Sequence, residues 1–189
     1  MLKFNLPGDT HFVTTKTFAN YPFFKAINCC DLFLQNLNFY RNKYELKIYG
    51  YCLMPDHVHL LLNFDLKKFP ELTISNVMHG IKGRSAQSIS TYLLSSSETG
   101  NRSFYASAGI QSRQGIKALS TRDCLKIWQT SFYDFNIYTH KKLREKLNYI
   151  HKNPTKAKLV DDISQYKFCS WRNYNLDDHS IFKIDIINI

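Results

Sequence analysis

The sequence predicts an α+β fold in which two helices pack on one face of a small, mostly antiparallel sheet. The first observation is the order of the segments, which read strand, helix, strand, strand, helix, strand, helix along the chain. The second is that Pro55 and Asp56 form a tight turn between the two middle strands, and so short a connection favours an antiparallel hairpin. The third is a length of 189 residues without an evident internal repeat, which fits one domain spanning residues 1–189. This combination is typical of the ferredoxin-like arrangement.

The first strand and the first helix follow from residue type and period. Residues 11–19 are β-branched and aromatic, as expected of a strand. Pro22 then interrupts the pattern, and we expect a helix from Phe24 to about Arg41. Its apolar positions have the spacing of a buried helical stripe, and they are Ile27, Cys30, Leu34 and Leu37.

The middle of the chain predicts a hairpin and a second helix. A strand from Glu45 to Leu53 leads into the turn, and a second strand covers His57 to Phe64. The helix is expected from about Leu72 to Leu94. Its inward residues are Ile74, Val77, Met78 and Ile81, and its outward residues are Lys82 and Arg84.

The second half of the chain begins with a segment of different character. Residues 95–123 are dense in Ser and Gly and show no period, so we interpret them as a long loop or insertion. A strand is expected from Ile127 to Tyr138, followed by a helix from about His140 to Asn153. Pro154 predicts the end of this helix, because proline disfavours helical geometry at the residue before it.

Composition favours a nucleic-acid partner and gives no sign of a membrane or disulfide protein. The formal net charge is +10, and aromatic residues make up 15% of the chain. The charge suits a polyanion, and aromatic rings can stack on unpaired bases. The five cysteines are odd in number and have no C-x-x-C spacing, and no apolar run approaches the length of a membrane span. We therefore expect a cytoplasmic protein without a membrane partner.

Two histidines interrupt the apolar strand M-P-D-H-V-H-L-L-L at residues 54–62. Side chains alternate along a strand, so His57, His59 and Leu61 share one face. Two imidazoles at this spacing can hold one metal ion, or they can be polar residues at the wet end of a half-buried strand. A third group is needed to favour the metal.

The last predicted helix supplies a candidate for that group. Tyr149 and Asn153 are one turn apart, and Lys142 and Lys146 lie along the same flank. Such a strip is commonly solvated surface. A phenol, with a pKa near 10, is a poor nucleophile at neutral pH, but a divalent cation that polarises a phosphodiester makes it useful. Two imidazoles and one amide oxygen suit Mg²⁺ or Mn²⁺ and leave coordination positions open for phosphate.

The sequence Y-C-L-M-P-D-H-V-H-L-L-L, followed much later by L-N-Y-I-H-K-N-P-T-K-A-K-L-V, resembles the single-tyrosine HUH transposases. The segments I-W-Q-T-S-F-Y-D and S-W-R-N-Y resemble the branch associated with repetitive extragenic palindromes, the REP-associated tyrosine transposases. The resemblance covers most of residues 10 to 187. It implies one HUH domain with His57 and His59 as metal ligands, Asn153 as a further ligand, and Tyr149 as a nucleophile on a helix in the C-terminal half.

The resemblance also implies a reaction and a partner. The tyrosine attacks one DNA strand, leaving a 5′-phosphotyrosine and a free 3′-hydroxyl, and the substrate is single-stranded DNA marked by an adjacent hairpin. The residues expected to bind this DNA are Lys82, Arg84, Lys142, Lys146 and Lys156. The sequence departs from the family pattern in the length of 95–123 and in Phe135, where a polar or basic residue is common. A homodimer and a monomer both remain open, because both occur among such relatives.

Two alternatives to an active transposase remain. One is a domesticated DNA-binding protein that keeps the fold without transposition, and the other is an RNA-binding module that uses the sheet and its aromatic rings. The remaining histidines are interpreted as ordinary surface or helix-end residues, and these are His11, His79, His140, His151 and His179.

Overall fold

The computed structural model describes residues 9–98, 120–121 and 124–187. The strands are β1 (Asp9–Lys16), β2 (Lys47–Met54), β3 (His57–Phe64), β4 (Ser120–Thr121), β5 (Cys124–Leu125) and β6 (Tyr133–Asn136). The α-helices are α1 (Ile27–Tyr44), α2 (Ile74–Glu98), α5 (His140–Lys156) and α6 (Trp171–Asn175). Short 3-10 helices cover Phe18–Asn20, Phe23–Lys25 and Ile163–Gln165.

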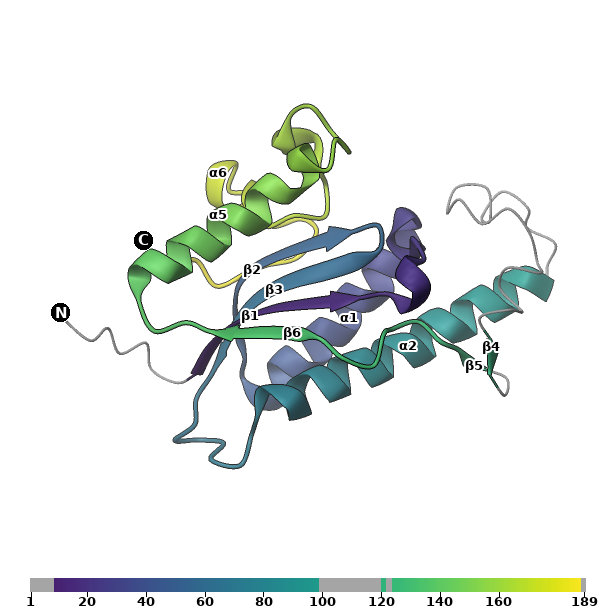
Figure 1. Cartoon of the computed structure of the whole chain (residues 1–189), viewed down its shortest axis with the longest axis horizontal. Coiled ribbons are helices and arrows are strands. Elements are labelled where there is room, and N and C mark those ends of the chain that lie inside the picture. The colour runs from purple at the N-terminus through teal and green to yellow at the C-terminus, as the bar shows by residue number, and fades with distance from the viewer. Residues whose placement is uncertain (1–8, 99–119, 122–123, 188–189) are drawn as a thin grey trace.

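Four strands form one antiparallel sheet in the order β2-β3-β1-β6 (Figure 1). The hairpin predicted around Pro55 and Asp56 joins β2 to β3, and β6 returns from the second half of the chain to pair with β1. This order is the ferredoxin-like one, so the predicted fold class is confirmed. It also makes β6 an edge strand of the sheet.

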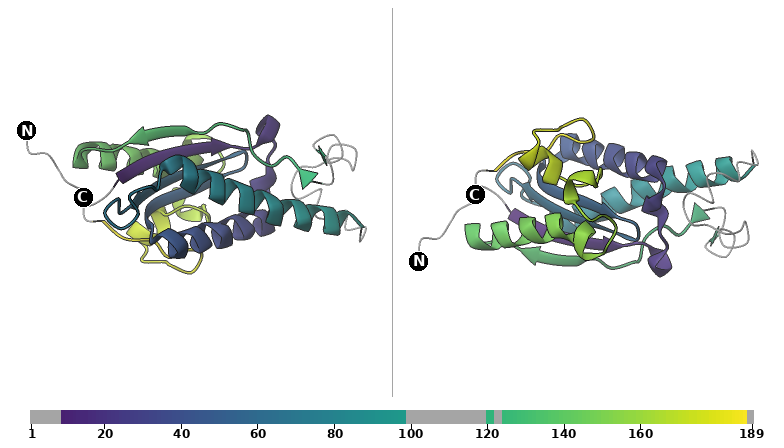
Figure 2. Two further views of the ribbon diagram at one scale, coloured as in Figure 1. Left: turned by 90° about the horizontal axis from the view of Figure 1, so that it is seen from below. Right: turned by 90° about the horizontal axis from the view of Figure 1, so that it is seen from above.

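Helices cover both faces of this sheet (Figure 2). As predicted, α1 and α2 pack together on one face, over a core that includes Val58, Leu60 and Leu62 of β3. The other face carries α5, over a second core that includes Phe12 and Leu61. The strict alternation along β3 therefore sorts its side chains between two different layers.

Gly50 in β2 sets how closely α5 approaches the sheet. A Cβ atom at this position would lie 2.8 Å from Cδ1 of Leu147 and 3.6 Å from Cδ1 of Ile150. The missing side chain lets two apolar residues of α5 settle against the strand, which has a bulge between Ile48 and Gly50. This contact fixes the helix that carries Tyr149.

The first helix begins later than predicted. Residues Phe23 to Lys25 form a separate 3-10 turn that buries Phe23 and Phe24, and α1 begins only at Ile27. Ile27 is 55% exposed, so its assignment to the buried stripe was wrong. Cys30, Leu34 and Leu37 are buried as expected.

The second helix is longer than predicted and ends at Glu98. Residues 95–98 of the expected loop are therefore helical, while most of the expected loop, 99–119 and 122–123, lies outside the described residues. In the described part of the chain, no helix is long and apolar enough to cross a membrane.

The predicted strand from Ile127 is mostly not a strand. Trp128 makes a single bridge to Thr17, and regular pairing starts at Tyr133. In the intervening backbone, the carbonyls of Gln129, Thr130 and Ser131 accept hydrogen bonds from a side chain of α2, as described below.

Helix α5 runs through Pro154 and ends at Lys156, so the predicted end at Asn153 was wrong. Pro154 is buried, and its ring adds contacts to the layer beneath the helix. The backbone N–H of Ala157 still bonds the carbonyl of Asn153 at 2.9 Å, and that of Leu159 bonds the carbonyl of Pro154 at 3.0 Å. One missing donor near the end of a helix is tolerated when the following turn remains bonded.

Candidate active site

A cleft of about 550 Å³ lies between the sheet and α5. Four elements line it, since β1, the start of β3, β6 and α5 all contribute side chains. Its lining residues are Phe12, Thr14, Lys16, Asp56, His57, His59, Tyr133, Lys146, Tyr149 and Asn153. The cleft therefore contains the predicted histidine pair, tyrosine and amide together.

The two histidines lie side by side with one nitrogen of each ring already bonded. Their ring centroids are 4.8 Å apart. Nδ1 of His57 lies 2.6 Å from a carboxylate oxygen of Asp56, and Nδ1 of His59 lies 2.8 Å from Oγ1 of Thr14. Partners of this kind fix the tautomer and the ring orientation of metal-binding histidines, leaving Nε2 for the metal.

Asn153 completes this group from the opposite layer. Its Nδ2 lies 2.7 Å from Nε2 of His59, although the two residues are 94 positions apart in the sequence. A half-turn of the amide would present Oδ1 at the same place. His59 is only 2% exposed, and this burial, with the nearby His57 and Lys146, lowers its pKa to about 3. The imidazole is therefore neutral and keeps a lone pair, as a metal ligand requires.

Tyr149 is held beside the histidines by ring contacts. Its ring meets that of Phe12 edge-on at 5.7 Å and that of His59 at 5.3 Å. The residue is 45% exposed, so the ring is anchored on one side and open to the cleft on the other. A phenol positioned in this way can meet a substrate without first being uncovered.

Lysines flank the tyrosine and the histidines. The Nζ atom of Lys146 lies over the rings of Phe12 at 4.7 Å and Phe135 at 4.8 Å. Phe135, the residue that departs from the family pattern, thus supports a cation of the cleft. Lys16 is exposed at the end of β1, where it pairs with His57 across the sheet. Both ammonium groups can attract the phosphates of a nucleic acid.

Of the five residues predicted to bind DNA, all of which lie in the described part of the chain, only Lys146 lines the cleft. Lys142 forms an ion pair with Glu145 at 2.8 Å, and Lys156 is exposed on the last turn of α5. Arg84 belongs to the opposite face of the sheet, where its guanidinium lies 4.0 Å from the ring centre of Phe39. The structure therefore does not gather these residues into one patch.

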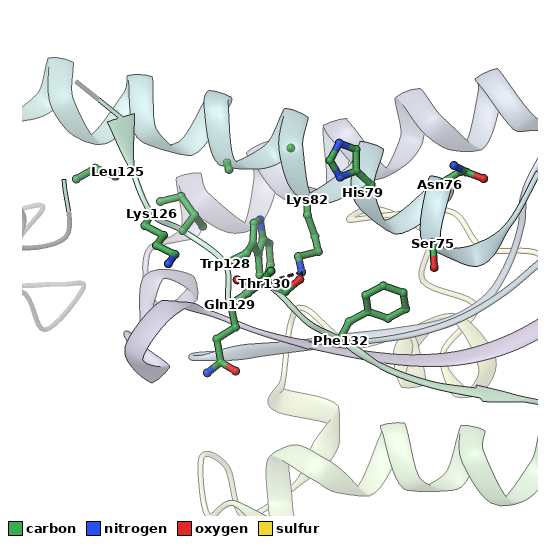
Figure 3. A pocket seen from close by; sticks show the side chains of 13 residues that line it. Ser75, Asn76, His79, Lys82, Leu125, Lys126, Trp128, Gln129, Thr130 and Phe132 are labelled. Atoms are coloured by element: carbon green, nitrogen blue, oxygen red, sulfur yellow. Dashed lines mark hydrogen bonds between the residues drawn. The ribbon is translucent and has the colours of Figure 1, made fainter. Parts of the chain in front are cut away.

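The outward orientation predicted for Lys82 was wrong. Lys82 is 9% exposed, and its ammonium lies beside Gln129 and Thr130, to whose carbonyls it donates at 2.8 and 3.0 Å (Figure 3). It also donates to the carbonyl of Ser131 at 3.2 Å. An ammonium has three hydrogens to donate, so these carbonyls satisfy it completely. These hydrogen bonds hold the segment before β6 against α2, so we do not propose Lys82 as a DNA-binding residue.

Two histidines interpreted as surface residues are buried instead. His151 is 8% exposed, and its Nε2 lies 3.0 Å from Oγ of Ser170, on the side of α5 away from Tyr149. His11 is 5% exposed and bonds Asp134 at 2.8 Å. The surface assignment of His151 failed because the sequence did not indicate that α5 is covered by the C-terminal segment, and that of His11 failed because the pairing of β1 with β6 was not visible in the sequence.

The cleft also contains residues that the sequence analysis did not identify as functional, namely Phe12, Thr14, Lys16, Asp56 and Tyr133. A period-two signal was present, because Phe12, Thr14 and Lys16 alternate along β1 and must share a face. What the sequence could not show is that this face is the one shared with His59, which depends on the register between β1 and β3.

The residues fit a divalent metal only if the amide is included. Among the described residues, no group of three or more His, Cys, Asp and Glu side chains could hold a metal ion. The two Nε2 atoms and the amide of Asn153 supply three donors on one side of the cleft, which leaves the other side for substrate.

Comparison with known proteins gives a family and a fold. Residues 11–120 match the model of a protein family described as "Transposase IS200 like". No curated protein sequence gives a significant match. A solved structure, "Structure of the REP associates tyrosine transposase bound to a REP hairpin", matches with a TM-score of 0.61 and 15% identity, covering 100% of this chain and 93% of that chain. A structure from Deinococcus radiodurans R1, described as a transposase, covers 79% of this chain and 95% of that chain, with 16% identity and a TM-score of 0.45.

Proposed function

The chain belongs to the family of IS200-like transposases, and on that premise we propose that it cuts and rejoins a single strand of DNA through a covalent bond to Tyr149. Cleavage and transfer of DNA strands is the activity of the family. The proposal concerns how this chain performs it, at which residues, and on what form of DNA.

The observation that carries the proposal is the convergence of four side chains from distant parts of the chain. His57 and His59 come from β3, and Tyr149 and Asn153 come from α5. The ring of Tyr149 lies 5.3 Å from that of His59, and the amide of Asn153 lies 2.7 Å from the same imidazole. All four side chains line one cleft, and Lys146 lines it as well.

The reaction that this arrangement supports is an exchange of one phosphoester bond for another. Oη of Tyr149 attacks the phosphorus atom and loses its proton to water in the open cleft. The bond from phosphorus to the 3′-oxygen breaks, and that oxygen leaves as a hydroxyl after gaining a proton. The 5′-phosphate stays on Tyr149, so a later attack by a 3′-hydroxyl can reverse the step and rejoin the strand.

His57, His59 and Asn153 would hold a divalent cation, Mg²⁺ or Mn²⁺. When bound, the cation polarises the phosphate and offsets the charge that develops on it. The protein's own contribution is to hold the ligands in place, through Asp56 on His57 and Thr14 on His59. Lys146 adds a fixed positive charge beside the phosphate.

We propose single-stranded DNA with a hairpin, or palindromic, element as the substrate. The fold likeness is to a REP-associated tyrosine transposase whose structure is bound to a REP hairpin, which supports assignment to that branch. The net charge of +10 is compatible with extended phosphate contacts. The proposed chemistry needs only one cleft, so it is compatible with a monomer and with a homodimer.

Replacing Tyr149 by Phe tests the proposal directly, because it removes the hydroxyl and keeps the ring packing. In Mn²⁺ reactions with oligonucleotides labelled at either end, the wild type should retain the product 3′ of the nick through its 5′-phosphate. Tyr149→Phe should bind the same DNA and yield neither nick nor adduct on denaturing gels. A water-activating nuclease would cut without an adduct, so cutting by Tyr149→Phe would overturn the assignment.

Comparing one further variant, His57→Ala, with Tyr149→Phe separates metal binding from the nucleophile. His57→Ala should abolish cleavage in Mn²⁺ and remove metal binding measured by calorimetry, while Tyr149→Phe should retain metal binding. If His57→Ala bound Mn²⁺ as the wild type does, the ligand assignment would be wrong. A protein that binds hairpin DNA but forms no adduct under any of these conditions would be the domesticated DNA-binding alternative.

A further inference from the structure

Tyr133 is an exposed aromatic residue of the cleft that the proposed chemistry does not use. It is the first residue of β6, the edge strand, and it is 51% exposed. It nevertheless lines the same cleft as Tyr149 and Asn153. A large aromatic ring that is half exposed at the rim of the cleft is a candidate binding surface for a ligand.

The sheet register directs Tyr133 to the catalytic side. It stands directly opposite Thr14 of β1, and residues directly opposite in an antiparallel pair project to the same face. Thr14 bonds His59, so Tyr133 and the proposed metal ligand share that face. The register cannot slip by one residue without turning Phe135 and its neighbours away from the core beneath α5.

Phe12 joins Tyr133 to the reacting groups. The ring of Tyr133 meets Phe12 edge-on, with centroids 6.2 Å apart and an interplanar angle of 68°. The same Phe12 ring lies 5.7 Å from Tyr149 and 5.7 Å from His59. The ring of Phe12 therefore lies between Tyr133 and both Tyr149 and His59. Tyr133 is thus only one ring away from the proposed nucleophile and from a proposed metal ligand.

The ammonium group of Lys146, which also lines the cleft, lies near the rings of both Tyr133 and Phe12. Nζ of Lys146 lies 5.9 Å from the ring centre of Tyr133 and 4.7 Å from that of Phe12. A phosphate attracted to this ammonium would bring the base of its nucleotide beside the Tyr133 ring. Aromatic rings interleaved with cations are the arrangement that binds single-stranded nucleic acid.

Resting on the proposed function, we propose that Tyr133 is the platform on which the unpaired base adjoining the scissile phosphate stacks. The ligand is a base of single-stranded DNA, because a base inside a duplex already has both faces covered by its neighbours. Tyr133 thereby selects an unpaired strand at the point of cleavage and holds the phosphate in reach of Tyr149. Its ring carries this role, and its hydroxyl has none.

The first experiment measures binding without metal, so that its outcome does not depend on cleavage. The probes are a fluorescein-labelled oligo-dT strand and a duplex of the same length, titrated with the full chain. Tyr133→Ala should weaken binding of the single strand by about tenfold, the effect of losing one stacked base, and should leave the duplex unchanged. Tyr133→Phe should bind as the wild type does.

Tyr138 provides the matched control. It is also a tyrosine, it lies five residues further along the same segment, and it is 71% exposed, but it does not line the cleft. Tyr138→Ala should leave both affinities within about twofold. Both alanine variants replace exposed side chains, so thermal unfolding should match the wild type closely.

The second experiment identifies which base is involved. Covalent adducts formed by the wild type from a random single-stranded library in Mn²⁺ give the cleaved sequence, which is then remade with one abasic position at a time. At one position next to the nick, the abasic strand should raise KM for wild type and for Tyr138→Ala, but should add nothing to the defect of Tyr133→Ala. This loss of additivity is the signature of direct contact.

Several results would contradict the proposal that Tyr133 stacks an unpaired base. Equal weakening of single strand and duplex by Tyr133→Ala would make it a general DNA contact, and no weakening would remove it from binding altogether. Loss of binding in Tyr133→Phe would assign the role to the hydroxyl. If the wild type forms no adduct, the proposed function fails, whereas the oligo-dT titration still decides whether Tyr133 stacks a base.

Discussion

His59 combines burial with an available nitrogen. It is 2% exposed, yet its Nε2 faces the amide of Asn153 at 2.7 Å, and its Nδ1 is taken by Thr14 at 2.8 Å. A neutral imidazole bonded in this way contributes to packing as well as to chemistry. Substituting it should therefore cost stability, unlike a ligand on the surface. His57, whose side chain is 20% exposed, is the better position at which to test the metal alone.

His151 predicts an acid sensitivity of the fold. Its Nε2 lies 3.0 Å from Oγ of Ser170, which accepts a hydrogen bond from the backbone N–H of Tyr51, so the hydroxyl hydrogen is free to be donated to a neutral imidazole. The ring of Tyr174 lies 5.6 Å away. Burial lowers the pKa of His151 from 6.5 to about 4. The neutral form is thus the one that the folded protein favours.

The sign of the effect follows from proton uptake. The unfolded chain protonates His151 near pH 6.5 and the folded chain only near pH 4, so stability is full above about pH 6.5 and falls as the pH is lowered toward 4. His151→Gln keeps an acceptor for Ser170 without titrating. The free energy of unfolding in urea should lose up to ~3 kcal/mol less between pH 7 and pH 4 in this variant than in the wild type.

His79 supplies the control for this measurement, because it is exposed on α2. His79→Gln should show the wild-type pH dependence. If His151→Gln and the wild type lost the same free energy over this range, His151 would not be the group that titrates. Part of the wild-type loss should remain in either case, since the pKa of His59 is lowered in the same direction.

At the scale of elements, the three hydrogen bonds of Lys82 determine how the segment before β6 is held. Lys82→Met keeps the length of the side chain and removes the ammonium, which leaves the carbonyls of Gln129, Thr130 and Ser131 without this donor. We expect a loss of about 2 kcal/mol in the free energy of unfolding, measured by urea titration, because bonds to a charged donor exceed neutral ones.

Arg84→Met is the neighbouring comparison, two residues along α2. Its guanidinium lies over the ring of Phe39, a contact that is weak on an exposed surface, so the loss should stay below ~1 kcal/mol. Equal destabilisation by both variants would mean that the carbonyls are satisfied by water when Lys82 is removed. The same Lys82→Met protein should bind DNA as the wild type does, since the ammonium is not available to a phosphate.

The elements show where sequence patterns suffice. The β2–β3 hairpin was predictable because a turn as short as Pro55-Asp56 can join two strands only in an antiparallel hairpin. The course of α5 was predictable because Leu143, Leu147 and Ile150 are spaced with the period of a helix. The end of α5 was not predictable from Pro154, because the penalty of a proline depends on what its ring packs against. The segment from Ile127 was misassigned because a buried lysine on another helix, not local preference, holds its backbone.

The site was predictable to the extent that it depends on local spacing. His57 and His59 share a face because strands alternate, and Tyr149 and Asn153 share a flank because helices turn every 3.6 residues. Their meeting followed from family resemblance and not from either period. Thr14 and Tyr133 were missed because each joins the site through the register of β1 with β3 or β6, which a single sequence does not encode visibly. Asp56 was missed although it directly precedes His57, whose ring it bonds.

At the scale of the whole molecule, the positive charge should dominate DNA affinity. With a net charge of +10, binding of a hairpin-bearing single strand should weaken steeply as salt rises. Lys146→Met removes the cation of the cleft and should flatten the slope of log affinity against log salt by about 0.7, the amount for one phosphate contact on a single strand. Fluorescence anisotropy at several salt concentrations measures this slope.

Lys142→Met gives the comparison from the same helix. Its ammonium is paired with Glu145 at 2.8 Å, so a smaller change of slope is expected. An affinity that does not depend on salt would mean that the basic composition is unrelated to DNA binding. A slope that is the same in Lys146→Met and the wild type would remove Lys146 from the phosphate contacts.

His59 and Asn153 are 94 positions apart in the sequence, so they are also synthesised at different times. A ribosome adds about 5 to 20 residues per second, so the histidines leave it roughly 5 to 20 s before the tyrosine and the amide. During that interval the growing chain carries the two histidines but neither Tyr149 nor Asn153. Under the proposed mechanism, a product cut short before Tyr149 would lack both the nucleophile and the amide ligand, so an unfinished copy of this protein could not form the covalent bond to DNA.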